Sequence, residues 1–530
     1  MHRRQFLRAT VGLGVPAAVG ALSSRDGAAH PTEPSESNAT TATGTSTPTP
    51  TPTEAAATPT SGYEPLGSVA VEDATEAVTT TDGETAFVAA LDGFAAVDLA
   101  DPADPTVLAE KRDISPPGTT QVMTGIQDVK YDDGRLLVAG PANYDPDGFH
   151  GIALYDVSDP ASPELLRAYQ TAYPIHNCDL SGGYAYLTGN NRDDNPLVVV
   201  DVDRDEPAEV ARWSLFDHDP VWESVPVALR TLHDVFVRDG RAYLAHWDAG
   251  TWILDVSDPT APAYVGEVSQ LSPADLAELD GLAVSREQKE PPGNDHYAAV
   301  DPSGSLLAVG RETWNSNFGK EGTTPGPDDP GGPSGIDLYD LSDPASPAHL
   351  ATVDPPPTAD PNVNGVWTTA HNFEIAAGHL YSSWYRGGVA VHDLSDPANP
   401  ERVRYFRRSS ETSFWTAQLA APGDAVVATS YGDPSLTDAE SRLYTFPDVP
   451  RATPTATSTT GSPDETATPP TTAPTPTETA AGGPTRDGTD AVETGGATDE
   501  DGPGFGPLAA LAGVGLGTWR LLQERGEDKD

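Results

Sequence analysis

Four histidines occupy the same position in successive copies of a repeated sequence pattern. His176, His233 and His371 each stand seven residues before the glycine of a predicted turn, and His296 stands eight residues before one. Imidazole nitrogens are common ligands of zinc, copper and iron. If the four rings converge, two or three of them together with a nearby carboxylate would form a transition-metal site. The spacing therefore predicts a candidate metal site at these four histidines.

Polar residues directly follow three of these histidines, namely Asn177, Asp234 and Asn372. Such neighbours can orient imidazole nitrogens that bind a metal. The same pattern fits a second interpretation, in which each histidine is a hydrogen-bonding element inside its own unit and the rings never meet. The sequence leaves these two interpretations open. We interpret the remaining histidines as ordinary structural residues, for example His246, His349 and His392.

A second set of candidate residues combines aromatic rings with arginines, after the second strand predicted in several units. Rings beside guanidinium groups suit the binding of an anionic, planar or sugar-like ligand. The same side chains are equally consistent with packing at the rim of a channel. The candidate ligand-binding residues are Trp247, Arg311, Trp314, Trp384 and Arg386, with His246 and Tyr385 beside them.

The units that carry these residues repeat between Tyr63 and Pro450. In each unit, short runs of alternating apolar residues are separated by Gly and Asp turns, a pattern that predicts four β-strands. The third run ends in an aspartate, followed in the clearest copies by Ser-Asp-Pro-x-x-Pro, as in Asp156–Pro163 and Asp255–Pro262. Aspartate side chains bond to nearby backbone and proline presets φ, so the motif predicts a turn between the third and fourth strands rather than a catalytic group.

The number and spacing of the units indicate a closed ring. The leading aspartates or their equivalents fall near residues 98, 156, 201, 255, 340, 393 and 446, a period typical of propeller blades. The last unit lacks a fourth strand, and Pro65–Val71 resembles the fourth strands of other units. We therefore predict an all-β fold: a seven-bladed β-propeller of four-stranded blades, closed by the N-terminal strand and flanked by disordered Thr/Pro-rich segments. An eighth unit hidden within residues 263–335 is the alternative, but residues 271–290 have a helical pattern.

Two short motifs carry a family resemblance over residues 63–450. Leu197-Val-Val-Val-Asp201 and Ile253-Leu-Asp-Val256 resemble LVIVD repeats. The resemblance implies a secreted or surface propeller, in most cases one without an established activity. The segments Leu380–Trp384 and Asp393–Pro397 are more faintly similar to selenium-binding protein/methanethiol oxidase propellers, which are redox enzymes with a histidine-bound metal. That second match is too partial to bring an activity with it.

The composition limits the classes of partner. The chain has 80 acidic and 30 basic residues and a formal charge of −50, and only five of its residues are lysine. This excludes a general nucleic-acid binder and argues against docking on anionic lipid. Abundant carboxylates with few lysines are typical of proteins that stay soluble in molar salt, so the sequence indicates an extreme halophile. A single cysteine, Cys178, permits no internal disulfide.

Residues 1–26 are interpreted as an export signal. Arg3, Arg4, Phe6 and Leu7 resemble the twin-arginine signature, which implies export of the folded chain by the Tat translocase. Residues 27–62 follow as a disordered Thr/Pro-rich linker. The linker contains the N-glycosylation sequon that begins at Asn38, although an unmodified linker fits equally well.

Residues 451–502 are interpreted as a disordered stalk of Thr, Pro and acidic residues, and residues 503–530 as a sorting segment. Pro503, Gly504 and Phe505, with the apolar run after them, resemble the PGF-CTERM signal, which implies cleavage by an archaeosortase and a lipid anchor. The match departs from that pattern because the run is short and Gly-rich and the end is acidic. A frayed amphipathic tail is the alternative.

Two hypotheses of function follow. The first is an exported, monomeric propeller anchored at the cell surface by its C-terminus, which binds a surface protein or a glycan. The second is an extracellular metal-dependent enzyme, redox or hydrolytic, that uses the histidines. The sequence favours the first because it contains no serine-nucleophile elbow, phosphate-binding loop, His-Glu-x-x-His or Cys-x-x-Cys motif.

Overall fold

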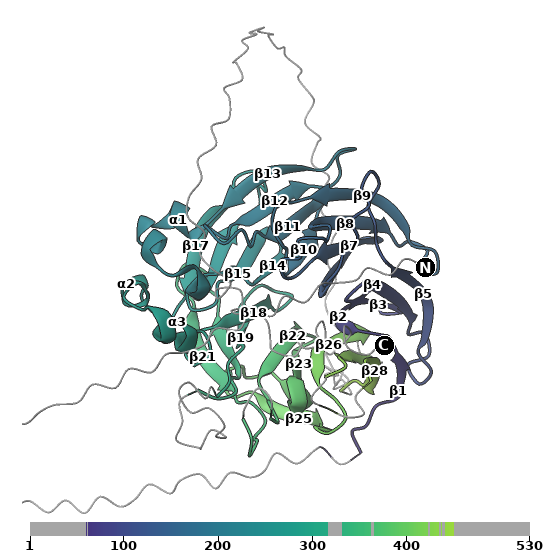
Figure 1. The fold of residues 1–530 in the computed structure, drawn as a ribbon. Helices are drawn as coiled ribbons and strands as arrows, with labels where there is room; N and C mark the ends of the chain where they lie inside the picture. Colours follow the sequence, from purple (N-terminus) through teal and green to yellow (C-terminus); the bar gives the residue numbers. More distant parts are fainter. Residues whose placement is uncertain are drawn as a thin grey trace, which may run out of the picture. The chain divides into compact units, whose positions relative to one another are not determined.

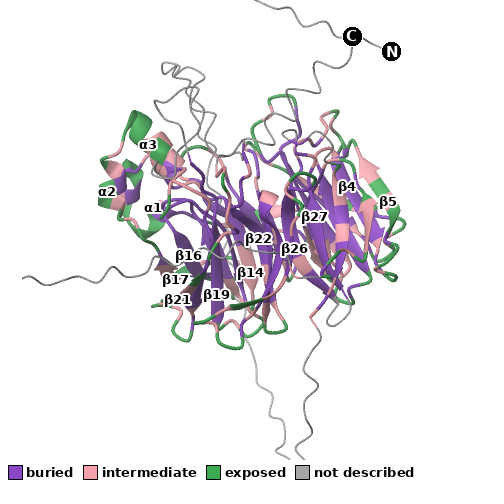
Figure 2. Cartoon of the chain, turned by 90° about the horizontal axis from the view of Figure 1, so that it is seen from below, coloured by how far each residue is buried: buried purple, intermediate pink, exposed green. Residues whose placement is uncertain are grey.

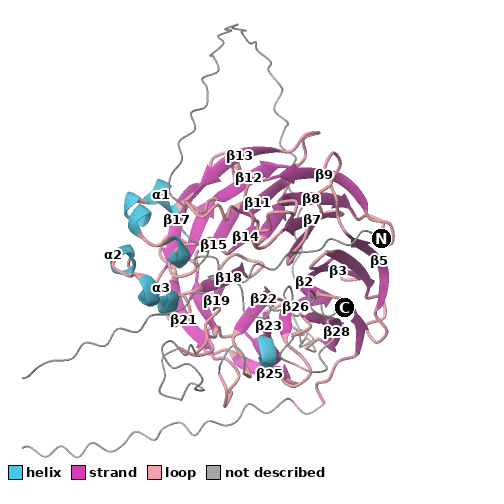
Figure 3. Ribbon diagram, viewed as in Figure 1, coloured by secondary structure: helices cyan, strands magenta, loops and turns pink. Residues whose placement is uncertain are grey.

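The computed structural model describes residues 60, 62–315, 331–361, 365–421, 425–433, 436 and 440–449. Within these residues the chain forms seven antiparallel four-stranded sheets that are arranged as blades around a ring (Figures 1 and 3). The predicted seven-bladed β-propeller is confirmed. The export signal at Arg3, Arg4, Phe6 and Leu7, the sequon at Asn38 and the sorting motif at 503–505 lie outside the described residues.

Blades one to six each consist of four strands that are consecutive in the chain. Blade one contains β2 (Ala74–Thr79), β3 (Thr85–Ala90), β4 (Gly93–Asp98) and β5 (Thr106–Arg112). Blade two contains β6 (Asp128–Asp132), β7 (Arg135–Gly140), β8 (Gly151–Asp156) and β9 (Glu164–Gln170). Blade three contains β10 (Cys178–Ser181), β11 (Tyr184–Thr188), β12 (Leu197–Asp201) and β13 (Ala208–Trp213). Blade four contains β14 (Asp234–Arg238), β15 (Arg241–Ala245), β16 (Thr251–Asp255) and β17 (Ala263–Val268). Blade five contains β18 (Asp295–Val300), β19 (Leu306–Arg311), β20 (Ile336–Asp340) and β21 (Ala348–Val353). Blade six contains β22 (Ala370–Ala376), β23 (His379–Trp384), β24 (Gly388–Asp393) and β25 (Glu401–Phe406).

Blade seven joins the two ends of the described chain. It contains β26 (Phe414–Ala421), β27 (Ala425–Ser430), β28 (Arg442–Pro447) and, as its outermost strand, β1 (Gly67–Ala70). β1 is antiparallel to β28, with Gly67 opposite Thr445. Just before β1, the ring of Tyr63 stacks on Phe446 with centroids 5.6 Å apart. The predicted closure by the N-terminal strand is therefore confirmed, and it removes an unpaired sheet edge.

Burial changes across each blade from the inside to the outside. The first strands of neighbouring blades contact one another and surround the central channel. The middle strands, such as β3 and β19, are buried throughout, whereas every residue of an outermost strand such as β5 is exposed or half-buried (Figure 2). Aliphatic and aromatic side chains between adjacent blades form the core. Apolar burial of this kind is the main term that stabilises the ring.

The two ends of the propeller differ in their connections. At the end where the innermost strands begin, the loops carry α1 (Leu215–His218), η1 (Pro220–Ser224), η2 (Val227–Leu229), α2 (Pro273–Ala277), α3 (Gly281–Glu287) and η3 (Tyr385–Gly387). We call this the loop end; α1, α2 and α3 gather there in Figure 2. The helices α2 and α3 fill the predicted helical stretch, so no eighth blade is hidden there.

The opposite end, the turn end, carries short turns with the Ser-Asp-Pro motifs. In the turn after β8, the backbone N–H of Ser158 donates to Asp156 Oδ1 at 2.9 Å, and the N–H of Ser257 donates to Asp255 Oδ1 at the same distance. In both turns, the side chain of an aspartate accepts a hydrogen bond from the backbone N–H two residues later, which is the turn that aspartate favours. The prediction of a turn role for the motif is confirmed.

Carboxylates on the innermost strands connect neighbouring blades. Asp128 Oδ2 accepts a hydrogen bond from the N–H of Cys178 at 2.8 Å, and Asp179 Oδ2 accepts one from Val237 at 2.5 Å. Glu374 Oε2 accepts one from the N–H of Leu419 at 2.8 Å. Each bond satisfies a backbone donor that would otherwise face the next blade without a partner.

We expect Glu374→Ala to lower the free energy of unfolding by about 1–3 kcal/mol, because the N–H of Leu419 loses its acceptor. Glu374→Gln keeps an acceptor oxygen for that N–H, so we expect it to lose less stability than the alanine variant. Chemical denaturation at fixed salt measures both variants. Equal losses of stability in the alanine and glutamine variants would show that the hydrogen bond from Leu419 does not stabilise the contact between the two blades.

Candidate metal centre

The start of the innermost strand places one histidine in each of four consecutive blades at the loop end. His176 and His233 stand just before β10 and β14, and His296 and His371 are the second residues of β18 and β22. Their rings form a row. The centroids of His176 and His233 are 4.2 Å apart, those of His233 and His296 4.0 Å, and those of His296 and His371 4.8 Å. The predicted convergence is confirmed, and the interpretation in which the rings never meet is wrong.

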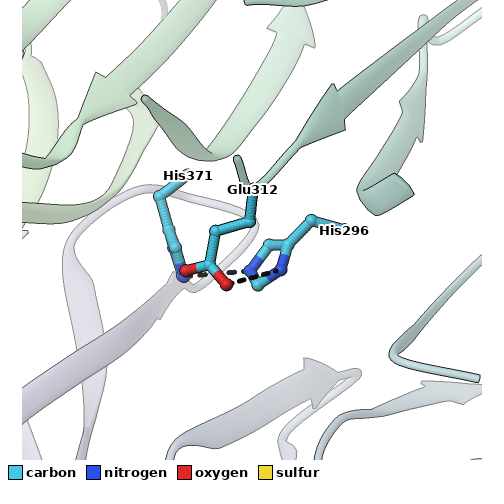
Figure 4. Close-up of side chains that lie close together, drawn as sticks. All are labelled: His296, Glu312 and His371. Carbon is cyan, nitrogen blue, oxygen red and sulfur yellow. Dashed lines mark hydrogen bonds and ion pairs between the residues drawn. The ribbon is translucent and has the colours of Figure 1, made fainter. Parts of the chain in front are cut away.

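A carboxylate joins the row from a different part of blade five. Glu312 directly follows β19, and its Oε2 lies 3.5 Å from His296 Nδ1. His296 Nε2 lies 3.1 Å from His371 Nε2. Figure 4 shows the three side chains pointing toward one another, and one ligand atom from each lies within 4.8 Å of the others. Glu312 is not among the residues predicted from the sequence, because no other unit has a carboxylate directly after its second strand.

Backbone carbonyls fix the orientation of two of the rings. His371 Nδ1 lies 2.6 Å from the carbonyl oxygen of Trp415, and His233 Nδ1 lies 3.1 Å from that of His296. A carbonyl oxygen only accepts hydrogen bonds, so each Nδ1 carries the proton and donates it. Nε2 of both rings therefore keeps a lone pair, which is the form that binds a metal.

The polar neighbours predicted to orient the rings divide into two groups. Asn177 Oδ1 lies 3.3 Å from His176 Nδ1, as expected of an orienting partner. Asp234 and Asn372 bond elsewhere: Asp234 accepts from the side chain of Asn177, and Asn372 donates to Glu76 Oε2 at 2.5 Å. Asp234 and Asn372 thus belong to a separate layer, one residue farther along the innermost strands toward the turn end.

Burial sets the protonation of the site. It lowers the pKa of His176, His233, His296 and His371, in the last case to about 3, so all four rings are neutral at pH 7. Burial also raises the pKa of the Glu312 carboxyl to about 7, against the opposing effect of a hydrogen bond from Tyr385. Neutral imidazoles beside a buried carboxyl group can act together as ligands of a cation.

His296 is the least satisfied member of the set. The Nε2 of His371 is an acceptor, so a neutral His296 can donate its only ring N–H there. Its Nδ1 then has a lone pair that faces a carboxylate oxygen, and that buried nitrogen has no hydrogen-bond partner among the described residues. Two facing acceptors require a proton or a cation between them.

Five aromatic side chains pack beside His371 and form what we call the aromatic wall: Trp314, Trp367, Tyr385, Trp415 and Tyr431. The ring of His371 lies 4.3 Å from Trp415 and 4.9 Å from Tyr385. Tyr385 stacks on Trp367 at 4.1 Å, and its hydroxyl donates to Glu312 Oε1 at 2.6 Å. The wall thus keeps water from one side of the site and holds Glu312 in position.

Two of the five predicted ligand-binding residues lie beside this centre. Trp314 belongs to the aromatic wall, and the ring of Trp247 stacks near His233 with centroids 6.0 Å apart. Both side chains are buried. They help to enclose the histidine row.

The other three predicted ligand-binding residues have structural contacts instead. Arg311 is buried between Asp295 and Asp337, with ion-pair distances of 3.1 and 2.5 Å. Trp384 is only 1% exposed in the core of blade six, and Arg386 donates to the carbonyl oxygens of Ser409 and Gly365. The protein itself occupies the donors of the two arginines and encloses the ring of Trp384, and ligand binding by these three residues stays a prediction.

For the candidate centre, we expect Tyr385→Phe to weaken any metal binding by about tenfold, because the candidate ligand Glu312 loses the donor that orients it. Competition with a chromophoric chelator measures the affinity. Tyr405→Phe is the matched control, since that buried hydroxyl donates to the carbonyl oxygen of Gly387, outside the site. Equal affinities of the two variants would show that the hydroxyl has no part in holding the ligand.

A family model described as "LVIVD repeat" matches residues 147–171, 176–211 and 230–270, within blades two, three and four. No match to curated proteins was found.

Among solved structures, the β-propeller domain of Cps50 (Swd1) from Myceliophteria thermophila is 12% identical. The match covers 73% of this chain and 100% of that one, with a TM-score of 0.48. The WD40 propeller domain of Doa1 is 10% identical over 73% and 97% of the two chains, with a TM-score of 0.45. A functionally unknown protein from Desulfotomaculum acetoxidans is 11% identical over 63% and 85%, with a TM-score of 0.40.

Proposed function

We propose that this propeller, which carries LVIVD repeats, is an exported metalloprotein that binds one divalent transition-metal ion at the loop end of its channel. His296, Glu312 and His371 are the ligands, and His233 stands next to them with a free Nε2. The observation that carries the proposal is the His296 Nδ1 atom, which is buried, has no hydrogen-bond partner among the described residues and faces a carboxylate oxygen, while Nε2 of the same ring lies 3.1 Å from a second imidazole.

The donor set fits the chemistry of zinc, copper or iron. Two imidazoles and one carboxylate occupy three positions and leave others for His233, water or a substrate. A metal so bound supplies either Lewis acidity or a redox couple. The protein supplies neutral rings held by backbone carbonyls and a carboxylate held by Tyr385, within surroundings from which the aromatic wall excludes water.

The proposal also includes a place for the protein: outside the cytoplasmic membrane, at the cell surface. Support comes from the Tat-like signal at residues 1–26, the stalks at 27–62 and 451–502, and the sorting segment at 503–530. No helix in the described part of the chain is long and apolar enough to cross a membrane. Mass spectrometry of the C-terminal peptide from cell membranes tests the anchor: a cleaved, lipid-bearing end supports it, and an intact acidic terminus contradicts it.

Elemental analysis of protein purified in high salt tests the metal centre. We expect about one equivalent of zinc, copper or iron in the natural chain and none in His296→Ala/His371→Ala. His349→Ala is the matched control, because that side chain is 49% exposed on the outermost strand of blade five. A natural chain that stays free of metal after incubation with each ion would overturn the proposal.

A further inference from the structure

The channel contains a cavity at the end opposite the histidines. Its volume is about 490 Å³, within the range of small-ligand pockets. It is lined by the later residues of the innermost strands, among them Val78, Phe236, Arg238, Ala299 and Ala376. Because these strands begin at the loop end, the cavity belongs to the turn end.

A charged layer forms the deep end of this cavity and separates it from the histidines: Glu76, Asp128, Lys130, Asn177, Asp234 and Asn372. Three of its members directly follow a histidine of the row. Lys130 Nζ is paired with Asp128, Asn177 donates to Asp234, and Asn372 donates to Glu76. One Asp234 oxygen, Oδ1, is buried with no partner in the described part of the chain. The layer thus already holds one ammonium group, and its carboxylates outnumber it.

The walls of the cavity add more negative charge. Asp179 and Glu374 line it together with Glu76, and Lys130 and Arg238 are the cationic side chains in the lining. With Asp128 and Asp234 behind the surface, five carboxyl groups stand against two cations. Burial raises the pKa of Glu76 and of Asp179 to about 7, because it disfavours their charged form. A cation bound beside them would stabilise that charged form and would itself be stabilised by it.

Aromatic faces line the same cavity. Phe236, Tyr297 and Phe373 are part of its wall, and the rings of Tyr297 and Phe373 meet edge to face at 4.9 Å. At the rim, the guanidinium of Arg238 lies 5.1 Å from the ring centroid of Phe236, so this wall already accepts one organic cation.

Tyr297 provides an independent sign of a ligand. Its side chain lines the cavity although the residue is only 9% exposed, and its hydroxyl has no hydrogen-bond partner in the described residues. That hydroxyl is accessible from the cavity, so it is available to a molecule there.

We propose that the turn-end cavity binds a small organic ammonium ion, a mono- or diamine, through Glu76, Asp179 and Glu374, with the aromatic rings against its alkyl chain and the Tyr297 hydroxyl as a further polar contact. Carboxylates combined with aromatic faces are the groups that recognise such cations. The excess of carboxylates repels an anion of the same size. This site is separate from the metal centre and does not depend on it.

Titration calorimetry with 1,4-diaminobutane at constant salt tests the proposal on the full chain. We expect saturable binding of one diamine, and about tenfold weaker binding by Glu374→Gln, which removes the charge but keeps the acceptor for Leu419. Glu401→Gln, on the exposed outermost strand of blade six, is the control and should bind as tightly as the natural chain.

Two further probes have the length of the diamine but different charge: 1,4-butanediol and succinate. Neither should bind. Equal binding of butanediol would indicate a polyol site, and binding of succinate an anion site; either result overturns the proposal. Absence of diamine binding also overturns the proposal. So does binding that Glu374→Gln and Glu401→Gln weaken equally, because the diamine would then be a counterion spread over the acidic surface and not a ligand of the cavity.

Discussion

Lys130→Met is expected to lower the free energy of unfolding by about 3–5 kcal/mol, the usual result of removing one partner of a buried ion pair. The Lys130 side chain is 12% exposed and its partner Asp128 is 3% exposed. Asp128 and Asp234, with Glu76, surround the ammonium group and raise its pKa well above the usual value, despite the opposing effect of burial. Methionine fills a similar volume, so the loss measures charge rather than packing.

Chemical denaturation at constant salt measures the effect, and Lys111→Met is the matched control. Lys111 is the last residue but one of the outermost strand β5 and lies outside the charged layer. We expect the control to change stability by less than about 0.5 kcal/mol. A loss below about 1 kcal/mol in Lys130→Met would mean that the layer is well hydrated or protonated without its lysine, and the ion pair would then be incidental.

The blades could be predicted from the sequence because the information repeats. Alternating apolar runs, Asp-Gly turns and Ser-Asp-Pro motifs recur with one period, so an uncertain strand in one unit is supported by its counterparts in the others. Closure could be predicted for a related reason. The last unit lacks a strand, and the segment at Pro65–Val71 had no other unit to join.

The candidate site could be predicted only as far as it repeats. His176, His233, His296 and His371 occupy one position of the unit, and the ring symmetry of the blades brings that position together at the channel. Glu312 had no such signal. It directly follows β19, where no other unit has a carboxylate, and its Oε2 lies 3.5 Å from His296 Nδ1.

The contacts of two predicted ligand-binding residues show what the sequence leaves open. Residue type and closeness to the loop end in sequence are what suggest Arg311 and Trp384. A strand alternates between its two faces: Arg311 meets Asp295 and Asp337 of its own blade, and Trp384 packs in a core cluster of blades five and six. Residue type predicts which chemistry a side chain can do, but only the register of the strand decides what it faces.

Glu312→Gln tests the ligand that the sequence did not reveal, and we expect it to weaken metal binding by at least about 100-fold. Glutamine keeps the size of the side chain and an acceptor for the Tyr385 hydroxyl, but it removes the charge that would neutralise the metal. Competition with a chromophoric chelator measures the change, and Glu401→Gln controls for the loss of one charge from an acidic protein. If Glu312→Gln binds the metal within about threefold of the natural chain, the carboxylate is not a ligand. The centre would then consist of imidazoles alone, with His233, whose ring centroid lies 4.0 Å from that of His296, in the third position.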